Sequence, residues 1–229
     1  MQLQGRTLYK DGSWNTLCLP FDVTTASGTL SGDNVQAMTL NTSTSNLTSG
    51  TLTLNFTDAE TIPAGTPFII KWDESGTDIT SPVFEGVTID AEKHDATIEG
   101  VLTFTGTYAA VSIGSEGDNT KLFLSSNNAL YYPNTAMTIG SQRAYFQLLG
   151  RLTAGEPAGG IEQGIDQDDP VSAFVLNFGG DEATGILTTN FTNSTNSGNE
   201  WYSIDGRKLS GKPTQRGIYI NNGKRVVIK

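Results

Sequence analysis

The segment TLTLNFT, residues 51–57, alternates apolar and polar side chains with a period of two. Successive side chains of a β-strand point to opposite faces, so Leu52, Leu54 and Phe56 would share one face. The threonines and Asn55 would share the other. One apolar face and one polar face are typical of a strand in a sheet with one solvated side. This segment therefore predicts a strand of a layered β-protein.

Short segments of the same type recur along the chain, separated by Gly, Asn, Asp or Pro. In VLTFTGTY, Leu102 and Phe104 share one face and threonines occupy the other. Asp11-Gly12 and Asn127-Asn128 favour hairpin turns, because these residues tolerate positive φ. The strand-like segments are RTLYK, WNTLCLPFDV, NVQAMTL, TLTLNFT, PFIIKW, PVFEGVTI, ATIEGVLTFTGTYA, KLFLSS, ALYYP and RAYFQLLG.

No segment places apolar residues at the i, i+3, i+4, i+7 spacing of a long helix. Threonine, which is abundant, favours strands, and the abundant glycine and asparagine favour turns. Many short strands separated by turn residues are typical of a sandwich or barrel. We therefore expect an all-β protein whose main part is an antiparallel β-sandwich of the Greek-key or jelly-roll type, followed by a small C-terminal β-hairpin module.

Changes in composition predict the domain boundaries. The main sandwich is expected over residues 1–186, with an exposed, mobile loop at 151–170 that is rich in Gly and acidic residues. Residues 187–200 form a polar, low-complexity segment typical of a linker. Residues 201–229 then resume strand character and form the predicted C-terminal module.

Charge separates that module from the rest of the chain. The protein has a formal net charge of −10, yet residues 201–229 contain seven lysine or arginine residues and one acid, Asp205. Overall acidity argues against nucleic-acid binding, which needs clustered basic side chains. The basic residues of the tail alternate with apolar strand residues, so a nucleic-acid-binding arm is not expected there either.

Three strands are expected in the tail: 201–204, 218–220 and 225–229. Asn222-Gly223 is a strong signal for a two-residue hairpin turn between the last two. Ile218 and Ile220 would share a face, with Val226 and Ile228 opposite them. A free sheet of this size is marginally stable, so it should dock on the main body or on a partner.

The tail sequence DGRKLSGKPTQRGIYINNGKRVVIK resembles the C-terminal segment of many secreted and surface proteins of Bacteroidetes. Related forms serve there as sorting signals for type IX secretion. The resemblance implies a role in export or surface attachment, with the tail contacting that machinery. The alternative is a structural role, in which its apolar residues complete the main core. The motif positions are Gly206, Arg207, Gly217, Tyr219, Asn222 and Gly223, with Lys208, Ile218, Lys224 and 226–229 also matching.

The body has a second resemblance. TLYKDGSWNTLCLPFDV, IPAGTPFIIKW, LYYPNTAMTIGSQRAYFQL and AFVLNFGGDEATGI are similar to blocks near the C-terminus of Bacteroidetes surface proteins labelled as adhesins or leucine-rich-repeat surface proteins. This implies a non-catalytic adhesion or scaffold domain at the cell surface or outside the cell. Its partner would be an extracellular protein or glycan. The alternative is a carbohydrate-binding module of a glycan-utilisation system.

No pattern of residues predicts an enzyme, a cofactor or a metal site. Cys18, flanked by leucines, is expected to be a buried, inert thiol, and His94 lies in a polar segment. A Cys–His pair would require that segment to fold back onto a core strand. Acidic groups at Asp73/Glu74, Glu92/Asp95 and Asp166/Asp168/Asp169 are interpreted as solvated loop charges rather than as glycosidase carboxylates or calcium ligands.

Aromatic residues give the only candidates for surface recognition. Trp14, Trp72 and Trp201 are expected mainly to pack in the core. Tyr131 and Tyr132 would point to opposite faces of one strand, so that one of them is exposed. The following Pro133 predicts that the strand ends there, near loops that often bind ligands.

The first residues, MQLQGRTLYKDG, lack the apolar segment of a signal peptide. The sequence therefore leaves open a cytosolic protein or an exported one whose leader lies upstream of Met1. No apolar run reaches the ~18 residues of a membrane span. With the two resemblances, we expect a secreted or surface location.

Overall fold

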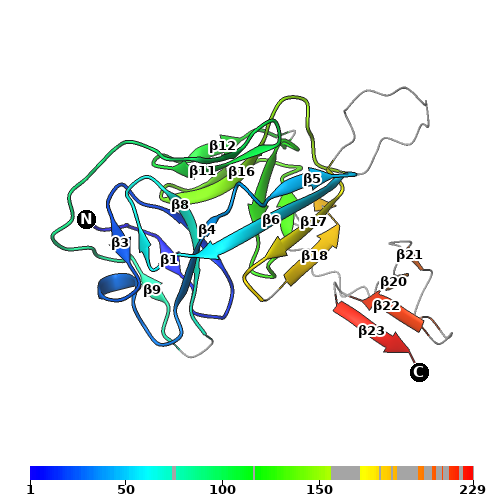
Figure 1. The fold of residues 1–229 in the computed structure, drawn as a ribbon, viewed down its shortest axis with the longest axis horizontal. Coiled ribbons are helices and arrows are strands. Elements are labelled where there is room, and N and C mark those ends of the chain that lie inside the picture. The colour runs from blue at the N-terminus through cyan, green and yellow to red at the C-terminus, as the bar shows by residue number, and fades with distance from the viewer. Residues whose placement is uncertain are drawn as a thin grey trace. The chain divides into compact units, whose positions relative to one another are not determined.

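The computed structural model describes residues 1–73, 76–115, 117–155, 171–180, 182–186, 188–189, 201–203, 208–209, 213, 217–221 and 224–228. The chain forms two compact units, Met1–Asn190 and Phe191–Lys229. Nearly all regular structure in the described residues is β-strand, apart from a short 3-10 turn, η1 (Gly28–Leu30) (Figure 1). The predicted all-β, sandwich-like class is confirmed.

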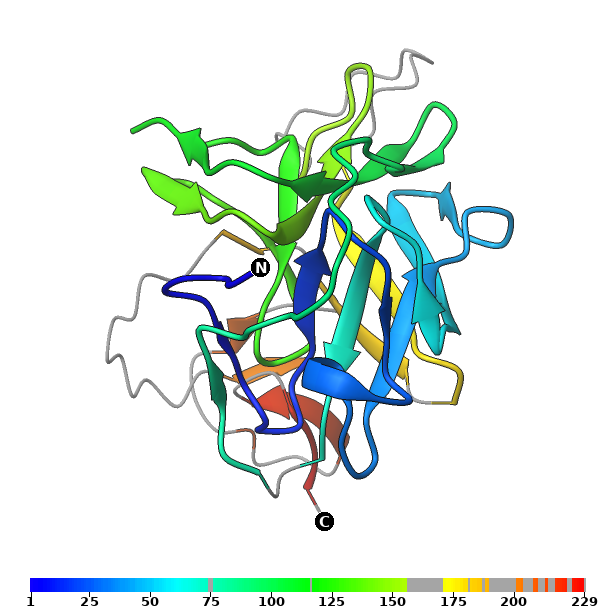
Figure 2. The same cartoon turned by 90° about the vertical axis from the view of Figure 1, so that its left-hand side faces the viewer.

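A seven-stranded sheet runs through most of the first unit. Its order is β18-β17-β6-β4-β8-β2, with β5 paired to β6, so that β2 lies at one edge. Figure 2 shows its blue and cyan strands side by side. The strands are β2 (Asn15–Cys18), β4 (Gln36–Leu40), β5 (Asn46–Thr48), β6 (Thr51–Asp58), β8 (Pro67–Lys71), β17 (Ala173–Asn177) and β18 (Glu182–Ile186).

A six-stranded sheet, in the order β10-β11-β16-β13-β14-β19, packs against the first. Leu52, Leu54 and Phe56 of β6 are buried in the shared core, as their alternation predicts. From the opposite sheet Phe104 packs edge-on to Phe56, with ring centroids 6.3 Å apart. The strands are β10 (Ala96–Ile98), β11 (Leu102–Thr107), β13 (Lys121–Leu124), β14 (Leu130–Tyr132), β16 (Arg143–Leu148) and β19 (Thr188–Thr189).

Most neighbouring strands are antiparallel, but β6–β17 and β14–β19 are parallel pairs. The sequence predicts an antiparallel sandwich and gives no sign of these two pairs. A parallel pair needs a long crossover connection, which cannot be recognised from turn residues. β19 also lies inside the predicted linker, so Thr188 and Thr189 belong to the sheet rather than to a connection.

The outer face of the seven-stranded sheet carries a second core. In β8, Ile69 faces the sandwich interior, whereas Phe68 and Ile70 face this outer cluster. Leu17 and Trp72 join them and are likewise buried. The sequence predicts sheets with one solvated face, and here that expectation is wrong because an additional layer covers the sheet. That layer comprises η1, the N-terminal residues and the short strands β1 (Thr7–Leu8), β3 (Val23–Thr24), β7 (Thr61–Ile62) and β9 (Ile79–Thr80).

The two predicted turns have different outcomes. Asn128 has a φ of 54° and joins β13 to β14 in an antiparallel hairpin, as expected. Gly12 also has positive φ, at 78°, but β1 pairs with β9 and β2 pairs with β8. The Asp11-Gly12 turn therefore connects two separate strand pairs rather than a hairpin.

A two-stranded ribbon of β12 (Val111–Ile113) and β15 (Met137–Ile139) projects beside the six-stranded sheet. Ile113 and Ile139 of the ribbon form a small buried cluster with Tyr145 of β16. Across the described ranges, no helix is long and apolar enough to cross a membrane.

The second unit is a four-stranded antiparallel sheet in the order β21-β20-β22-β23. Its strands are β20 (Trp201–Ser203), β21 (Lys208–Leu209), β22 (Gly217–Asn221) and β23 (Lys224–Ile228). The sequence predicts three of them and misses β21. The expected antiparallel pair of β22 and β23 is confirmed, but Ile218 pairs with Val227 and Ile220 with Arg225.

Several expectations concern residues outside the described ranges. These expectations are most of the predicted mobile loop, at 156–170, and most of the predicted linker, at 187 and 190–200. The tail-motif residues Gly206, Arg207, Asn222 and Gly223 also lie outside them. Gly217 and Tyr219 lie in β22.

A candidate ligand-binding pocket

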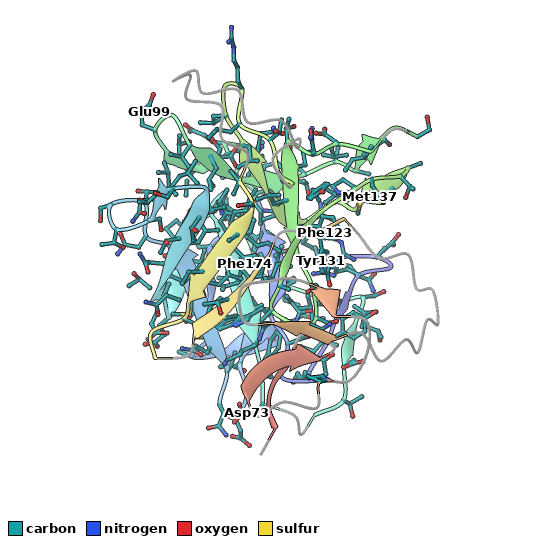
Figure 3. All side chains as sticks on the ribbon, turned by 90° about the vertical axis from the view of Figure 1, so that its right-hand side faces the viewer. Asp73, Glu99, Phe123, Tyr131, Met137 and Phe174 are labelled. Carbon is teal, nitrogen blue, oxygen red and sulfur yellow. The ribbon has the colours of Figure 1, made fainter. Side chains whose placement is uncertain are left out.

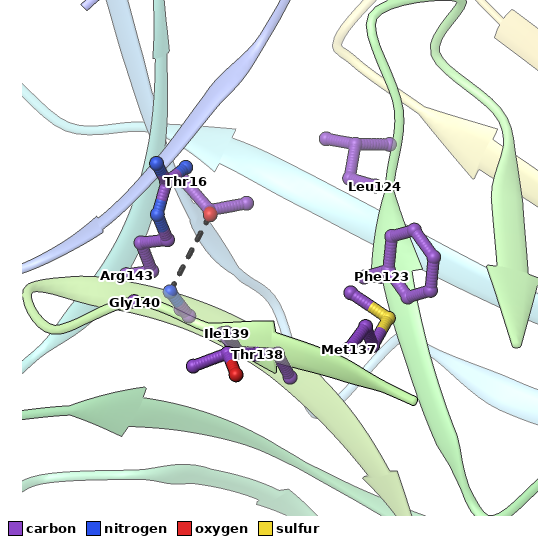
Figure 4. Close-up of a pocket in the computed structure, with 9 residues that line it drawn as sticks. Thr16, Phe123, Leu124, Met137, Thr138, Ile139, Gly140 and Arg143 are labelled. Atoms are coloured by element: carbon purple, nitrogen blue, oxygen red, sulfur yellow. Dashed lines mark hydrogen bonds between the residues drawn. The ribbon is translucent and has the colours of Figure 1, made fainter. Parts of the chain in front are cut away.

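A pocket of about 290 Å³ opens where β2 meets β13, β16 and the β12–β15 ribbon (Figure 4). Arg143 and Thr16 lie on one side of it, and Phe123 and Leu124 on the other. Its lining is Thr16, Phe123, Leu124, Met137, Thr138, Ile139, Gly140, Arg143 and Ala144.

A tight turn before β16 places Arg143 at the pocket. Gln142 adopts a φ of 51° and donates its backbone N–H to the Thr107 carbonyl at 2.6 Å. The Thr107 hydroxyl donates to the Gly140 carbonyl at 2.8 Å and accepts the Arg143 N–H at 3.0 Å. These bonds satisfy the turn's backbone groups and fix where β16 begins.

The two sheets meet directly at this point. The Ala144 N–H of β16 donates to the Thr16 hydroxyl of β2 at 3.4 Å, a bond between residues 128 positions apart. Because β2 is an edge strand, its outward carbonyls need partners from elsewhere. The Arg6 Nη2 supplies one by donating to the Thr16 carbonyl at 3.0 Å.

Two guanidinium groups therefore lie at the same end of the sandwich. Arg6 is only 6 % exposed, and its Nε has no hydrogen-bond partner in the described structure. Burial, and then the charge of Arg143, lower the Arg6 pKa to about 10. Burial also lowers the pKa of Arg143, whereas Tyr9 acts to raise both values. Neither arginine forms an ion pair within the described ranges.

The opposite side of the pocket is apolar. The Phe123 ring packs edge-on against Tyr131 of β14, with centroids 5.1 Å apart. Met137 lies beside them at the end of the ribbon (Figure 3). The pocket thus combines a cationic side with an aromatic and aliphatic side, which is a common composition of small-molecule sites.

The candidate recognition residues Tyr131 and Tyr132 do not line the pocket. Both are half-buried, and β14 pairs with β13 on one side and β19 on the other. Tyr131 contacts Phe123, whereas Tyr132 packs against the main core. Their separate environments agree with the expected alternation, but neither tyrosine is exposed as the sequence predicts; β14 ends at Tyr132, before Pro133, as expected.

Cys18 is fully buried, as the sequence predicts. Burial and the charge of Asp95 raise the pKa of its thiol to about 11. The segment containing His94 does fold back onto this region, because the His94 N–H and the Cys18 Sγ both donate to the Gly65 carbonyl. The His94 side chain itself is exposed. At pH 7 Cys18 is therefore a protonated thiol rather than a nucleophile.

The candidate carboxylates that the structure describes form no cluster of three acidic groups. Asp73 and Glu92 are exposed, and Asp95 accepts the Gly106 N–H at 2.9 Å and pairs with Lys93 at 3.3 Å. Glu74, Asp166, Asp168 and Asp169 lie outside the described residues. In the part that is described, no three His, Cys, Asp or Glu residues are grouped so as to hold a metal ion.

Trp14 and Trp72 are core residues, as expected. Trp14 stacks on Phe178 with centroids 5.0 Å apart and lies beneath Lys71, and Trp72 is buried in the outer core. The side chain of Trp201 is outside the described structure.

The sequence gives little sign of the cationic side of the pocket. Arg6 and Arg143 each begin a strand-like segment, RTLYK and RAYFQLLG, and nothing local distinguishes them from other surface cations. Their association comes from the tertiary structure.

No protein-family model matches the chain. No curated protein and no solved structure matches it either.

Proposed function

We propose that the protein is a non-catalytic β-domain of the cell surface or exterior, acting in adhesion or as a scaffold, with residues 201–229 serving in export or attachment. The observation that carries this proposal is the separate C-terminal unit. Phe191–Lys229 forms its own compact unit around a four-stranded sheet, and it concentrates basic charge at the end of an acidic chain.

The chemistry of the pocket favours binding over catalysis. Arg143 offers a fixed positive charge, and Phe123 and Met137 offer apolar contact. The lining residues include the hydroxyls of Thr16 and Thr138 but no general base, and nucleophilic catalysis needs a nucleophile and a base within hydrogen-bond reach of each other. The neighbouring Cys18 thiol is held protonated, which supports the same conclusion.

A carbohydrate-binding module is the second candidate. It is supported by the half-buried Phe123–Tyr131 pair, because aromatic rings commonly pack on the apolar faces of sugars. Trp14 and Trp72 are buried, so neither offers a sugar platform. An array of glycans beside an array of extracellular matrix proteins separates these candidates. Binding to glycans alone supports the module, whereas binding to matrix proteins alone supports adhesion.

Truncation after Asn199 in the native gene tests the role of the tail. The shortened protein should fold, as judged by circular dichroism and cooperative unfolding, but remain inside the cell. A matched variant that retains the tail and carries Arg151→Gln in the body should be exported normally. If the truncated protein reaches the surface as efficiently as the full chain, the export proposal is wrong.

A further inference from the structure

The pocket beside Arg143 holds more positive charge than the fold requires. Buried or half-buried charges are normally paired, because removing an ion from water is costly. Arg143 is half-buried and forms no ion pair within the described residues, and neither does the adjacent Arg6. Two such guanidinium groups repel each other, so a bound anion would relieve an existing electrostatic cost.

The Arg6 guanidinium donates to a backbone carbonyl, whereas the Arg143 guanidinium has no hydrogen bond to any residue that the structure describes. Arg6 donates to the Thr16 carbonyl and keeps a buried, unpartnered Nε. Arg6 does not line the pocket. Its positive charge lies next to β2 and adds to the positive potential at the pocket. Arg143 lines the pocket, so its planar fork of donors is available to a ligand.

The opposite side and the size of the pocket limit the rest of the ligand. A volume of about 290 Å³ is at the lower end for small-molecule sites, which commonly span roughly 300–1,000 Å³. Phe123, Leu124 and Met137 offer an apolar surface across from the guanidinium. A single ring with an acidic substituent fits both features, because the ring contacts the apolar side and the acid reaches Arg143.

We propose that this pocket binds a carboxylate carried on a small ring, with the Arg143 guanidinium as the direct partner of the carboxylate. The inference rests on the proposed non-catalytic binding function and specifies its ligand class. A planar carboxylate accepts two parallel hydrogen bonds from a guanidinium, which a neutral ligand cannot reproduce. The ring can belong to a sugar acid or to an aromatic acid.

Isothermal titration calorimetry of the full chain distinguishes a sugar acid from an aromatic acid. The probes are D-glucuronate and benzoate, each beside a neutral counterpart, methyl glucoside and benzyl alcohol. At least one acid should bind more tightly than its neutral counterpart, and the acid that binds identifies the type of ring. Arg143→Gln should weaken that binding at least about tenfold, because it removes a charge-assisted pair.

Arg151→Gln is the matched control, since it removes the same charge from an exposed residue that does not line the pocket. The affinity of this variant for the acid that binds should equal that of the unmodified protein. Arg143→Lys keeps the charge without the planar fork and should retain part of the affinity. It also keeps the test informative if the glutamine variant does not fold.

The inference is overturned if neither acid binds, if the neutral counterparts bind equally well, or if Arg143→Gln binds as the unmodified protein does. Export of the full chain and adhesion to matrix proteins are measured separately. Loss of acid binding with export and adhesion intact would reject the ligand class but leave the proposed function standing.

Discussion

Gly106 of β11 lies directly against the thiol of Cys18 on β2. A Cβ atom added at Gly106 would lie 2.1 Å from the Cys18 Sγ and 2.5 Å from its Cβ. The contact joins β2, the edge strand of the seven-stranded sheet, to β11, the second strand of the six-stranded sheet, next to the pocket. Close approach of the two backbones here therefore depends on the missing side chain.

Gly106→Ala should destabilise the protein by about 1–3 kcal/mol, because the added methyl group overpacks a buried contact between two strands. The measurement is the midpoint of urea unfolding followed by circular dichroism. Gly114→Ala is the control, since a Cβ at Gly114 would meet nothing within 4 Å and its φ is not positive. Equal stability of the two variants would contradict the proposed close contact.

Phe104→Ala should cost about 3–5 kcal/mol, because Phe104 is fully buried and stacks on Phe146 with centroids 4.5 Å apart. Thr103→Ala, one position earlier on the more exposed face of β11, should change stability much less. The free energies of unfolding of both variants are measured by urea unfolding, and the two curves are fitted with the same m-value. A loss below about 1 kcal/mol at Phe104 would show that it does not belong to a tightly packed core.

Local patterns predict the inner faces of the sheets and little about how the sheets assemble. The alternation of Leu52, Leu54 and Phe56 is sufficient to predict which face of β6 is buried, because residues two apart in a strand share a face. The partner of β6 on one side is β17, more than a hundred residues later, and no local signal specifies that pairing. Register and partner choice come from the packing of the whole sandwich.

The second core and the pocket cannot be recognised in the sequence for the same reason. In PFIIK, Phe68 and Ile70 resemble one face of a buried strand, but only the folded chain shows which residues cover them. Arg6 and Arg143 are brought together by the contact of β2 with β16. A sequence reveals the chemistry of such residues but not their neighbours.

Asp118 should matter for stability at neutral pH more than in acid. Burial acts to raise its pKa, but hydrogen bonds from Lys121 and Thr120 outweigh this, and the net pKa is lowered. A lowered folded-state pKa gives stability that is present above the ordinary pKa of 3.8 and is lost as the pH falls through the folded value.

Asp118→Ala should therefore cost about 1 kcal/mol at pH 7, the typical net value of such hydrogen bonds, and less near pH 2. The measurement is the free energy of unfolding across that range. Asp33→Ala, in an exposed turn, serves as the control and should show no comparable loss at neutral pH. A cost at Asp118 that stays constant down to pH 2 would show that its charge is not responsible.

The raised pKa of the Cys18 thiol predicts that the folded protein loses stability at alkaline pH. Its pKa rises from 9.0 to about 11 in the folded protein, chiefly by burial. Below pH 9 both the folded and unfolded chains keep the proton, so stability is unaffected. Between pH 9 and 11 the unfolded chain releases the proton and the folded chain retains it. The free energy of unfolding should then fall by up to about 1.4 kcal/mol per pH unit.

Tyr108 adds to this effect at higher pH, because burial and then Cys18 raise its pKa from 10.0 to about 12. Cys18→Ala should flatten the decline between pH 9 and 10, where Tyr108 contributes little, and Tyr108→Phe should leave that part of the curve largely intact. In the folded protein the thiol should also resist iodoacetamide at pH 8 and react once urea is added, since the thiolate is the reactive form. Equal rates of alkylation with and without urea would show that Cys18 is accessible, and the alkaline loss of stability would then need another source.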